Sequence, residues 1–191
     1  MIKSIFFVLI FLLIYNHSVK SQDFKGNSIK MGLGIGMAEG KQEVGMGGLF
    51  SFGFQKAILK NFLRINSTIV SGEFVPYAIT DTRDQYFNTT SLGIYGFVDI
   101  LKFKSVSLVA GTGGLINYSR GLLGTGGWPS IGNSYSEYFH HINFGFYLGG
   151  GLRFAPSKSR FSYELLPLNI VYGNNEFNMA YLNFGIEYKL K

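Results

Sequence analysis

Apolar residues alternate with polar or small residues along most of this chain, and this alternation constrains its fold more than any other feature. In the last twelve residues, the even positions from Ala180 to Leu190 are all apolar, whereas 183, 185, 187 and 189 are Asn, Gly, Glu and Lys. Similar alternation occurs in 29–37, 44–55 and 141–154. Successive side chains of a β-strand point to opposite faces, so a period of two predicts strands whose faces have different surroundings.

The pattern predicts an all-β chain of about eight strands. Alternation is weaker in 89–100, where both faces carry apolar residues, and in 160–172, where a change of phase at Pro167 predicts a bulge or an interrupted ladder. The expected strands are 28–38, 43–56, 62–72, 89–100, 105–118, 138–154, 160–172 and 177–190.

The connections between these strands alternate in length. Those at 57–61, 101–104 and 155–159 are short, whereas those at 73–88 and 119–137 are long; the connections at 39–42 and 173–176 fall on the same end as the long ones and are modest in length. Short periplasmic turns and longer external loops are typical of transmembrane β-barrels. The apolar faces carry large Phe, Leu, Ile and Met side chains, which would overfill an eight-stranded lumen. These faces are therefore expected to contact lipid; a soluble lipocalin-like carrier would need them to point inward.

Backbone groups in hydrocarbon must all be paired, so the first strand is expected to pair with the last. The predicted fold is an eight-stranded antiparallel up-and-down transmembrane β-barrel. Aromatic residues near strand ends are expected to form interfacial girdles. They are Tyr77, Tyr86, Phe87, Tyr118, Tyr138, Phe139, Tyr172 and Phe177 at the loop end, and Phe62, Phe103, Phe161 and Tyr188 at the turn end.

The first 21 residues are typical of a secretory signal peptide. Lys3 precedes the apolar run 5–14, and Val19 and Ser21 fit the −3 and −1 positions of a cleavage site. Ten apolar residues are too few to span a bilayer. Residues 22–191 are then a single barrel domain. Loss of Lys3 and Lys20 with the leader lowers the net charge from +6 to +4, too weak and scattered for nucleic acid.

Several charged residues fall on the face expected to line the lumen. We interpret them as a buried network of ion pairs and hydrogen bonds, because buried charges need partners. The alternative is an ion or solute path through a narrow pore. The predicted network residues are Lys30, Arg64, Arg153, Glu164 and Glu187.

No catalytic, cofactor or metal site is predicted. The chain lacks cysteine, and the adjacent His140 and His141 would point to opposite faces of a strand. An outer-membrane lipid-modifying enzyme would need Ser, His and an acid together on the outer surface. Ser134, Ser136 and Glu137 lie near His140 in sequence, but no motif surrounds them.

At its C-terminus the chain resembles the small outer-membrane β-barrels, the OmpA/OmpX-like and opacity/porin-type superfamily. The family's assembly signal matches Asn183, Gly185, Tyr188 and Leu190, although the chain ends in Lys191 rather than an aromatic residue. The resemblance implies recognition by the barrel-assembly machinery and a place in the outer membrane of a Gram-negative-type bacterium, among lipids that include lipopolysaccharide. We expect a monomer.

The connection 119–137 is the strongest candidate for a binding surface. It contains the only tryptophan, and loops of this length are often functional. Its apolar residues Leu122, Leu123, Trp128 and Ile131 form the candidate surface; Trp128 at the lipid interface is the alternative. The sequence therefore predicts a structural or surface-interacting role, with a narrow porin as the alternative and a lipid-modifying enzyme as a further one. It does not name an extracellular ligand.

Overall fold

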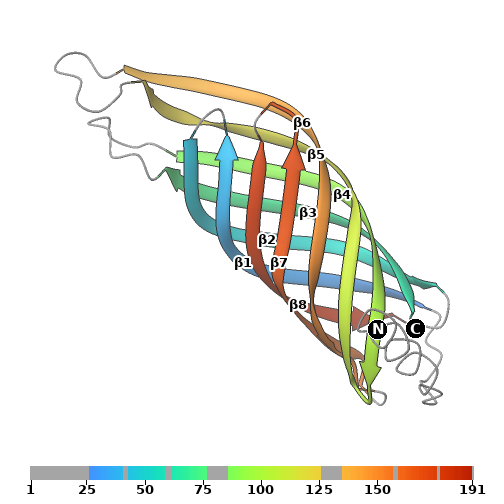
Figure 1. Cartoon of the computed structure of the whole chain (residues 1–191). Helices are drawn as coiled ribbons and strands as arrows, with labels where there is room; N and C mark the ends of the chain where they lie inside the picture. Colours follow the sequence, from blue (N-terminus) through green and yellow to red (C-terminus); the bar gives the residue numbers. More distant parts are fainter. Residues whose placement is uncertain are drawn as a thin grey trace, which may run out of the picture.

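The computed structural model describes residues 26–40, 43–58, 62–76, 86–125, 135–156, 159–175 and 177–190, which form a closed antiparallel barrel (Figure 1). Each strand pairs with the next, and β1 pairs with β8, which confirms the predicted eight-stranded fold. The strands are β1 (Asn27–Gly40), β2 (Glu43–Ile58), β3 (Leu63–Pro76), β4 (Tyr86–Phe103), β5 (Val106–Thr125), β6 (Tyr135–Phe154), β7 (Phe161–Gly173) and β8 (Asn178–Lys189).

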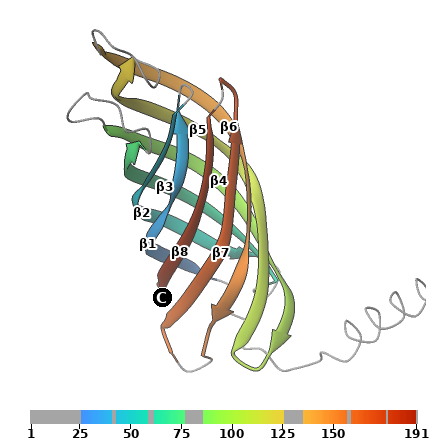
Figure 2. The same ribbon diagram turned by 60° about the vertical axis from the view of Figure 1, so that its left-hand side comes forward.

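The register of the eight ladders sets the tilt of the strands. Following paired residues around the barrel from Asn27 leads back to β1 at Met37, ten residues further along. With strands about 4.8 Å apart and a rise of about 3.3 Å per residue, this stagger requires a tilt of about 40° from the barrel axis. From β1 to β8, a row of paired residues therefore moves by about 3 Å per strand along the barrel axis, towards the end with the long connections. Figure 2 shows this tilt.

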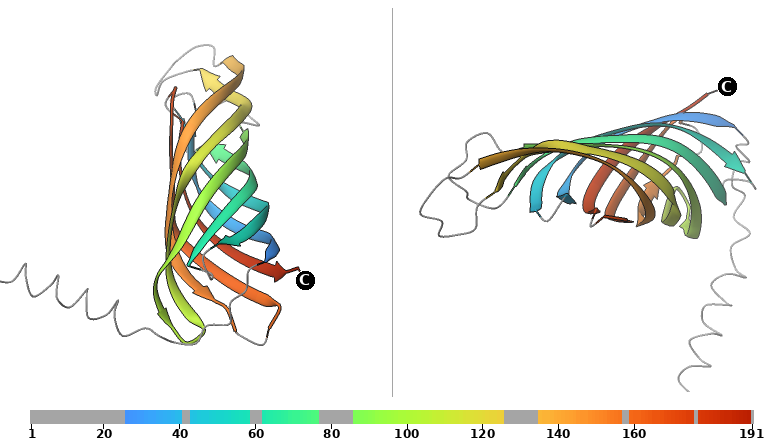
Figure 3. Two further views of the ribbon diagram at one scale, coloured as in Figure 1. Left: turned by 90° about the vertical axis from the view of Figure 1, so that its right-hand side faces the viewer. Right: turned by 90° about the horizontal axis from the view of Figure 1, so that it is seen from above.

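Strands β1 to β6 are all longer than the sequence pattern predicted, and β4 and β5 exceed it most. β4 has 18 residues, and β5 and β6 have 20 each, whereas β7 and β8 have 13 and 12. The ends of β5 and β6 project beyond the other strands on the side of the long connections, hereafter the loop end (Figure 3, left). Pairing between them continues from Tyr118 opposite Ile142 to Thr125 opposite Tyr135, so much of the expected loop 119–137 is a hairpin.

The apolar face of every strand points outward. Leu33 is 67% exposed, Ile94 64% and Phe144 62%, although such side chains are normally buried in water-soluble proteins. The opposite face is buried in the lumen. A lipid-facing exterior explains this pattern, which a soluble carrier would reverse. No helix in the described part of the chain is long and apolar enough to cross a membrane.

The change of phase at Pro167 is a local irregularity in β7. The register shifts between Leu166 and Asn169 against β8, and between Gly150 and Leu152 against β6. Proline has no N–H to donate to a ladder. The Asn169 amide nitrogen donates instead to the carbonyl oxygens of Leu166 and Tyr181, at 2.7 and 2.9 Å. The side chain therefore replaces backbone pairing where the ladder is interrupted.

Candidate functional site

Six charged side chains meet inside the barrel, close to the short-turn end. Each is one of the five residues of its strand that lie nearest that end, so the six side chains lie at a similar height along the barrel axis. The structure brings together all five residues singled out in the sequence. Three cations face three carboxylates, and the layer is neutral as a whole: Lys30, Arg64 and Arg153 against Asp99, Glu164 and Glu187.

Arg64 and Glu164 occupy the centre of this charged layer. Arg64 is fully buried; one guanidinium nitrogen contacts Glu164, and the other lies 2.9 Å from Asp99 Oδ1. The second Glu164 oxygen contacts the Lys30 ammonium. Both cations also lie over the Phe97 ring, with Lys30 Nζ 5.2 Å and Arg64 Cζ 5.7 Å from its centroid. These contacts compensate charges that burial would otherwise strongly disfavour.

Glu187 forms the second centre. Its Oε2 lies 2.8 Å from Arg153 Nη2, and its Oε1 accepts hydrogen bonds from Ser28 Oγ and Gln55 Nε2 at 2.8 and 2.7 Å. Arg153 also lies within 3.7 Å of Asp99 and 3.6 Å of Glu164, which joins the two centres. The contacts therefore involve seven strands, all but β5, and cross the β1–β8 junction.

Sequence reasoning missed Asp99, Gln55 and Ser28. A signal for Asp99 was present, because it shares the odd-numbered face of β4 with Thr89 and Ser91, and that face is buried. The apolar residues on both faces of β4 obscured it: Tyr95 and Phe97 also point inward and are 4% and 2% exposed.

An aromatic layer packs against the charged layer on the side that faces the middle of the barrel. The rings of Tyr95 and Tyr147 are 4.4 Å apart, and those of Phe97 and Tyr147 are 6.0 Å apart. The Tyr147 hydroxyl donates to Asn169 Oδ1 at 2.7 Å. The expectation that large rings would overfill the lumen is therefore wrong for these positions.

Glycines on neighbouring positions make room for the rings. A Cβ added at Gly93 would overlap Tyr95, one at Gly111 would lie 2.5 Å from the Phe97 ring, and one at Gly149 would overlap the Tyr147 hydroxyl. Real Cβ atoms do not approach other heavy atoms so closely. The glycines of the inner face thus complement individual aromatic side chains in a close-packed interior.

Towards the loop end, hydroxyl and amide groups and then phenylalanines fill the lumen. Asn117 Oδ1 accepts hydrogen bonds from Thr89 and Ser91, the latter at 2.7 Å. Beyond them the rings of Phe74 and Phe87 stack at 5.2 Å, and Phe139 lies 6.4 Å from Phe87.

Three of the predicted girdle residues therefore have a different position. Phe87, Phe139 and Phe177 are 0%, 3% and 1% exposed and point into the lumen. The outward rings at the loop end are instead tyrosines, namely Tyr86, Tyr118, Tyr138 and Tyr172. At the turn end Phe62, Phe103, Phe161 and Tyr188 are exposed, as expected for a girdle. Tyr77 lies outside the described residues.

The histidines form no metal cluster with other described residues. His140 and His141 are both exposed, and their rings lie near Tyr138 and Phe139, at 6.1 and 5.9 Å. Ser136 and Glu137 belong to β6, whereas Ser134 lies outside the described residues.

The candidate loop surface is only partly described. Leu122 and Leu123 are paired residues of β5, opposite Tyr138 and Glu137 of β6. Leu122 is half-buried. Trp128 and Ile131 lie outside the described residues. In the C-terminal signal, Asn183 and Gly185 are buried on the inner face of β8, Tyr188 is on the outer face, and Leu190 follows the strand.

Comparison with known proteins gives similar structures but no similar sequences. No protein-family model matches the sequence, and no curated protein matches it either. Neisserial surface protein A has 16% identity and a TM-score of 0.55, over 86% of this chain and 97% of that one. Ail, the attachment invasion locus protein of Yersinia pestis, has 16% identity and a TM-score of 0.51, over 87% and 100%. The fold is that of the small outer-membrane β-barrels. The resemblance read from the sequence is thus confirmed for the fold.

Proposed function

We propose that this chain is an outer-membrane β-barrel with a closed lumen, and that it acts at its extracellular end by contacting other molecules. The observation that carries the proposal is the filling of the lumen. A neutral charged layer, packed aromatic rings and a phenylalanine cluster follow one another along the barrel axis. Eight strands leave room for little more than side chains.

The β5–β6 hairpin, which projects beyond the other strands, supports contacts at this end. Its paired strands end at Thr125 and Tyr135, and the sequence between them, 126–134, contains Trp128. Tryptophan and tyrosine supply large contact areas with few rotatable bonds. The similarity in fold to a neisserial surface protein and to an attachment invasion locus protein is consistent with such a role.

Placement in the outer membrane also accounts for the C-terminal pattern. Asn183, Gly185, Tyr188 and Leu190 would be read by the barrel-assembly machinery, and β8 would then close the barrel against β1. Fractionation of the producing bacterium should place the folded protein with the outer membrane. It should migrate differently on gels before and after boiling, because a closed hydrogen-bonded barrel resists cold detergent.

Two measurements separate this function from a narrow porin. In planar bilayers, the purified barrel should show no steady conductance. Bacteria that display it should attach to a layer of cells more strongly than bacteria that lack it. Deletion of 126–134 should abolish that attachment, whereas Lys104→Ala in the opposite turn should preserve it.

Reproducible channels that change with Arg153→Ala would favour the porin instead. Attachment that survives the deletion in a correctly folded barrel would contradict the role of this hairpin.

A further inference from the structure

A row of polar side chains crosses the outer face of the barrel near its loop end. Glu73 pairs with Asn88, Asn88 with Arg120, and Arg120 with His140, on four consecutive strands from β3 to β6. Glu73, Arg120 and His140 are exposed and Asn88 is half-buried, on a face that is otherwise mostly apolar. Hydrocarbon would disfavour such a row, so its position relative to the membrane matters.

The row lies near the outer edge of the apolar band, with Val75, Tyr86 and Tyr138 exposed beyond it. Glu73 is ten residues from Leu63, the first residue of β3, and Arg120 is twelve residues from the exposed Leu108 of β5. With the rise and tilt given above, these separations are about 25 and 30 Å along the barrel axis. Because the apolar band of such barrels is about 25 Å tall, the row is level with lipid headgroups.

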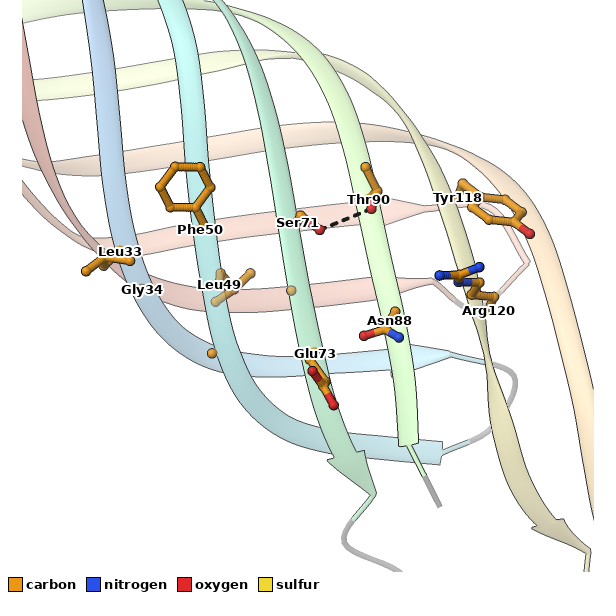
Figure 4. A pocket seen from close by; sticks show the side chains of 12 residues that line it. Leu33, Gly34, Leu49, Phe50, Ser71, Glu73, Asn88, Thr90, Tyr118 and Arg120 are labelled. Carbon is orange, nitrogen blue, oxygen red and sulfur yellow. Dashed lines mark hydrogen bonds between the residues drawn. The ribbon is translucent and has the colours of Figure 1, made fainter. Parts of the chain in front are cut away.

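Directly below the row the outer surface is hollowed. A groove of about 940 Å³ runs across β1 to β5 (Figure 4). Leu33 and Phe50 border it on β1 and β2, and Tyr118 borders it on β5. Its floor is made of small residues, because Gly48 has no side chain and the hydroxyls of Ser71 and Thr90 bond to each other at 3.2 Å.

The groove is thus amphipathic along the membrane normal. Its membrane-embedded side has the apolar Leu33 and Phe50 beside the mutually bonded hydroxyls of Ser71 and Thr90, and Glu73, Asn88 and Arg120 line its other side (Figure 4). Within the described part of the chain, Glu73 and Arg120 form no ion pair or hydrogen bond with each other or with any other side chain. The charges are therefore available to a ligand.

We propose that this groove binds one phosphorylated glycolipid of the outer leaflet. An acyl chain would lie over Gly48 and against the paired side chains of Leu33 and Phe50. Arg120, with His140 beside it, would bind a phosphate of the headgroup by charge-assisted hydrogen bonds. Asn88 and Glu73 would bind hydroxyl or amide groups of the sugar.

The composition of the row favours a glycolipid over other occupants. Four residues on adjacent strands span about 14 Å, which is wider than one phosphate group. A carboxylate and an amide beside two basic side chains suit a headgroup that has both sugar donors and phosphate. This inference rests on the proposed outer-membrane location but not on the role of the β5–β6 hairpin.

Native mass spectrometry of the folded barrel in detergent tests the proposal. The probes are bis-phosphorylated hexa-acyl lipid A in one arm and phosphatidylethanolamine in the other. Lipid A should bind in a one-to-one complex at least about tenfold more tightly than phosphatidylethanolamine. Arg120→Gln should weaken its binding by about tenfold to a hundredfold, because a hydrogen bond between charged groups is lost.

Matched variants separate the groove from the rest of the outer face. Gly48→Leu should block the acyl chain without disturbing the barrel, because a Cβ at Gly48 meets nothing within 4 Å. Gly114→Leu is its control, since Gly114 is another exposed glycine, on β5, whose nearest neighbouring atom is 3.9 Å from the added Cβ. Lys56→Gln is the control for charge, because Lys56 is exposed near the turn end of β2.

The change in gel migration on boiling should show that every variant is folded. Equal binding of the two lipids, or equal losses in Gly48→Leu and Gly114→Leu, would overturn the proposal. A dimer that Gly48→Leu dissociates would show that a second copy, rather than a lipid, occupies the groove. These outcomes do not depend on cell attachment, so they can fail independently of the proposed function.

Discussion

Replacement of Glu164 by Gln tests whether the charged layer holds the barrel together. The carboxylate is 1% exposed, contacts Lys30 and Arg64 directly, and lies 3.6 Å from Arg153. Its loss would leave three buried cations facing two carboxylates. Removal of one partner from a buried ion pair typically costs about 3–5 kcal/mol. We expect the free energy of unfolding to fall by that amount.

The assay is equilibrium unfolding of the barrel by urea in lipid vesicles. The folded fraction is measured on gels of unboiled samples, where folded and unfolded protein migrate differently. Glu73→Gln is the control, because that carboxylate is exposed and should contribute less than about 0.5 kcal/mol. The double variant Lys30→Met/Glu164→Gln restores the charge balance, so it should cost less than the sum of the single variants. A loss below 1 kcal/mol for Glu164→Gln, or strict additivity with Lys30→Met, would refute the reasoning.

Three further predictions follow from the two faces and from the leader. Phe144→Arg, on the lipid face, should destabilise the barrel by about 2–4 kcal/mol, whereas Phe144→Leu should have little effect; equal effects in vesicle unfolding would argue against a lipid-facing exterior. Gly149→Ala should cost about 1–3 kcal/mol in the same assay, because its methyl group overlaps Tyr147, whereas Gly96→Ala has its nearest neighbouring atom 3.9 Å away and should not. Intact-mass analysis of protein from outer membranes should place the mature N-terminus at Gln22, and retention of residues 1–21 would contradict a cleaved leader.

The strands and their orientation could be predicted because each depends on local pattern. Alternation assigns residues to two faces, and the size of Phe, Leu and Ile on one face decides which face meets lipid. The inward charges Lys30, Arg64 and Glu187 followed from the same parity. Asp99 and Phe87 would also have followed if the odd-numbered positions of β4 had been assigned to the lumen even though both faces of this strand carry apolar residues.

Phe139 and Phe177 were assigned to the girdle because aromatic residues near strand ends commonly lie at the interface. Both nevertheless share the odd-numbered, lumen-facing parity of Arg153 and Glu187, so alternation alone would have placed them inside. Other features depend on register, which a single sequence does not specify. The members of the row from Glu73 to His140 are up to 67 residues apart in sequence and are aligned only by the stagger of three ladders. The pattern also underestimated the length of β5 and β6, since these strands extend by pairing with each other.

The charged layer has a kinetic consequence, because it crosses the ladder that we expect to form last. β1 and β8 are separated by the whole barrel in sequence, so we expect their pairing to follow the seven hairpin ladders between neighbours. Ser28 of β1 reaches Glu187 of β8, and Lys30 reaches Glu164 of β7, only when that seam closes. Until then these groups would need water. A partly closed barrel is therefore unfavourable once it enters hydrocarbon, and the energy of the buried charges is gained in the closing step. Insertion and closure should consequently be one cooperative event, with the seam as its rate-limiting element.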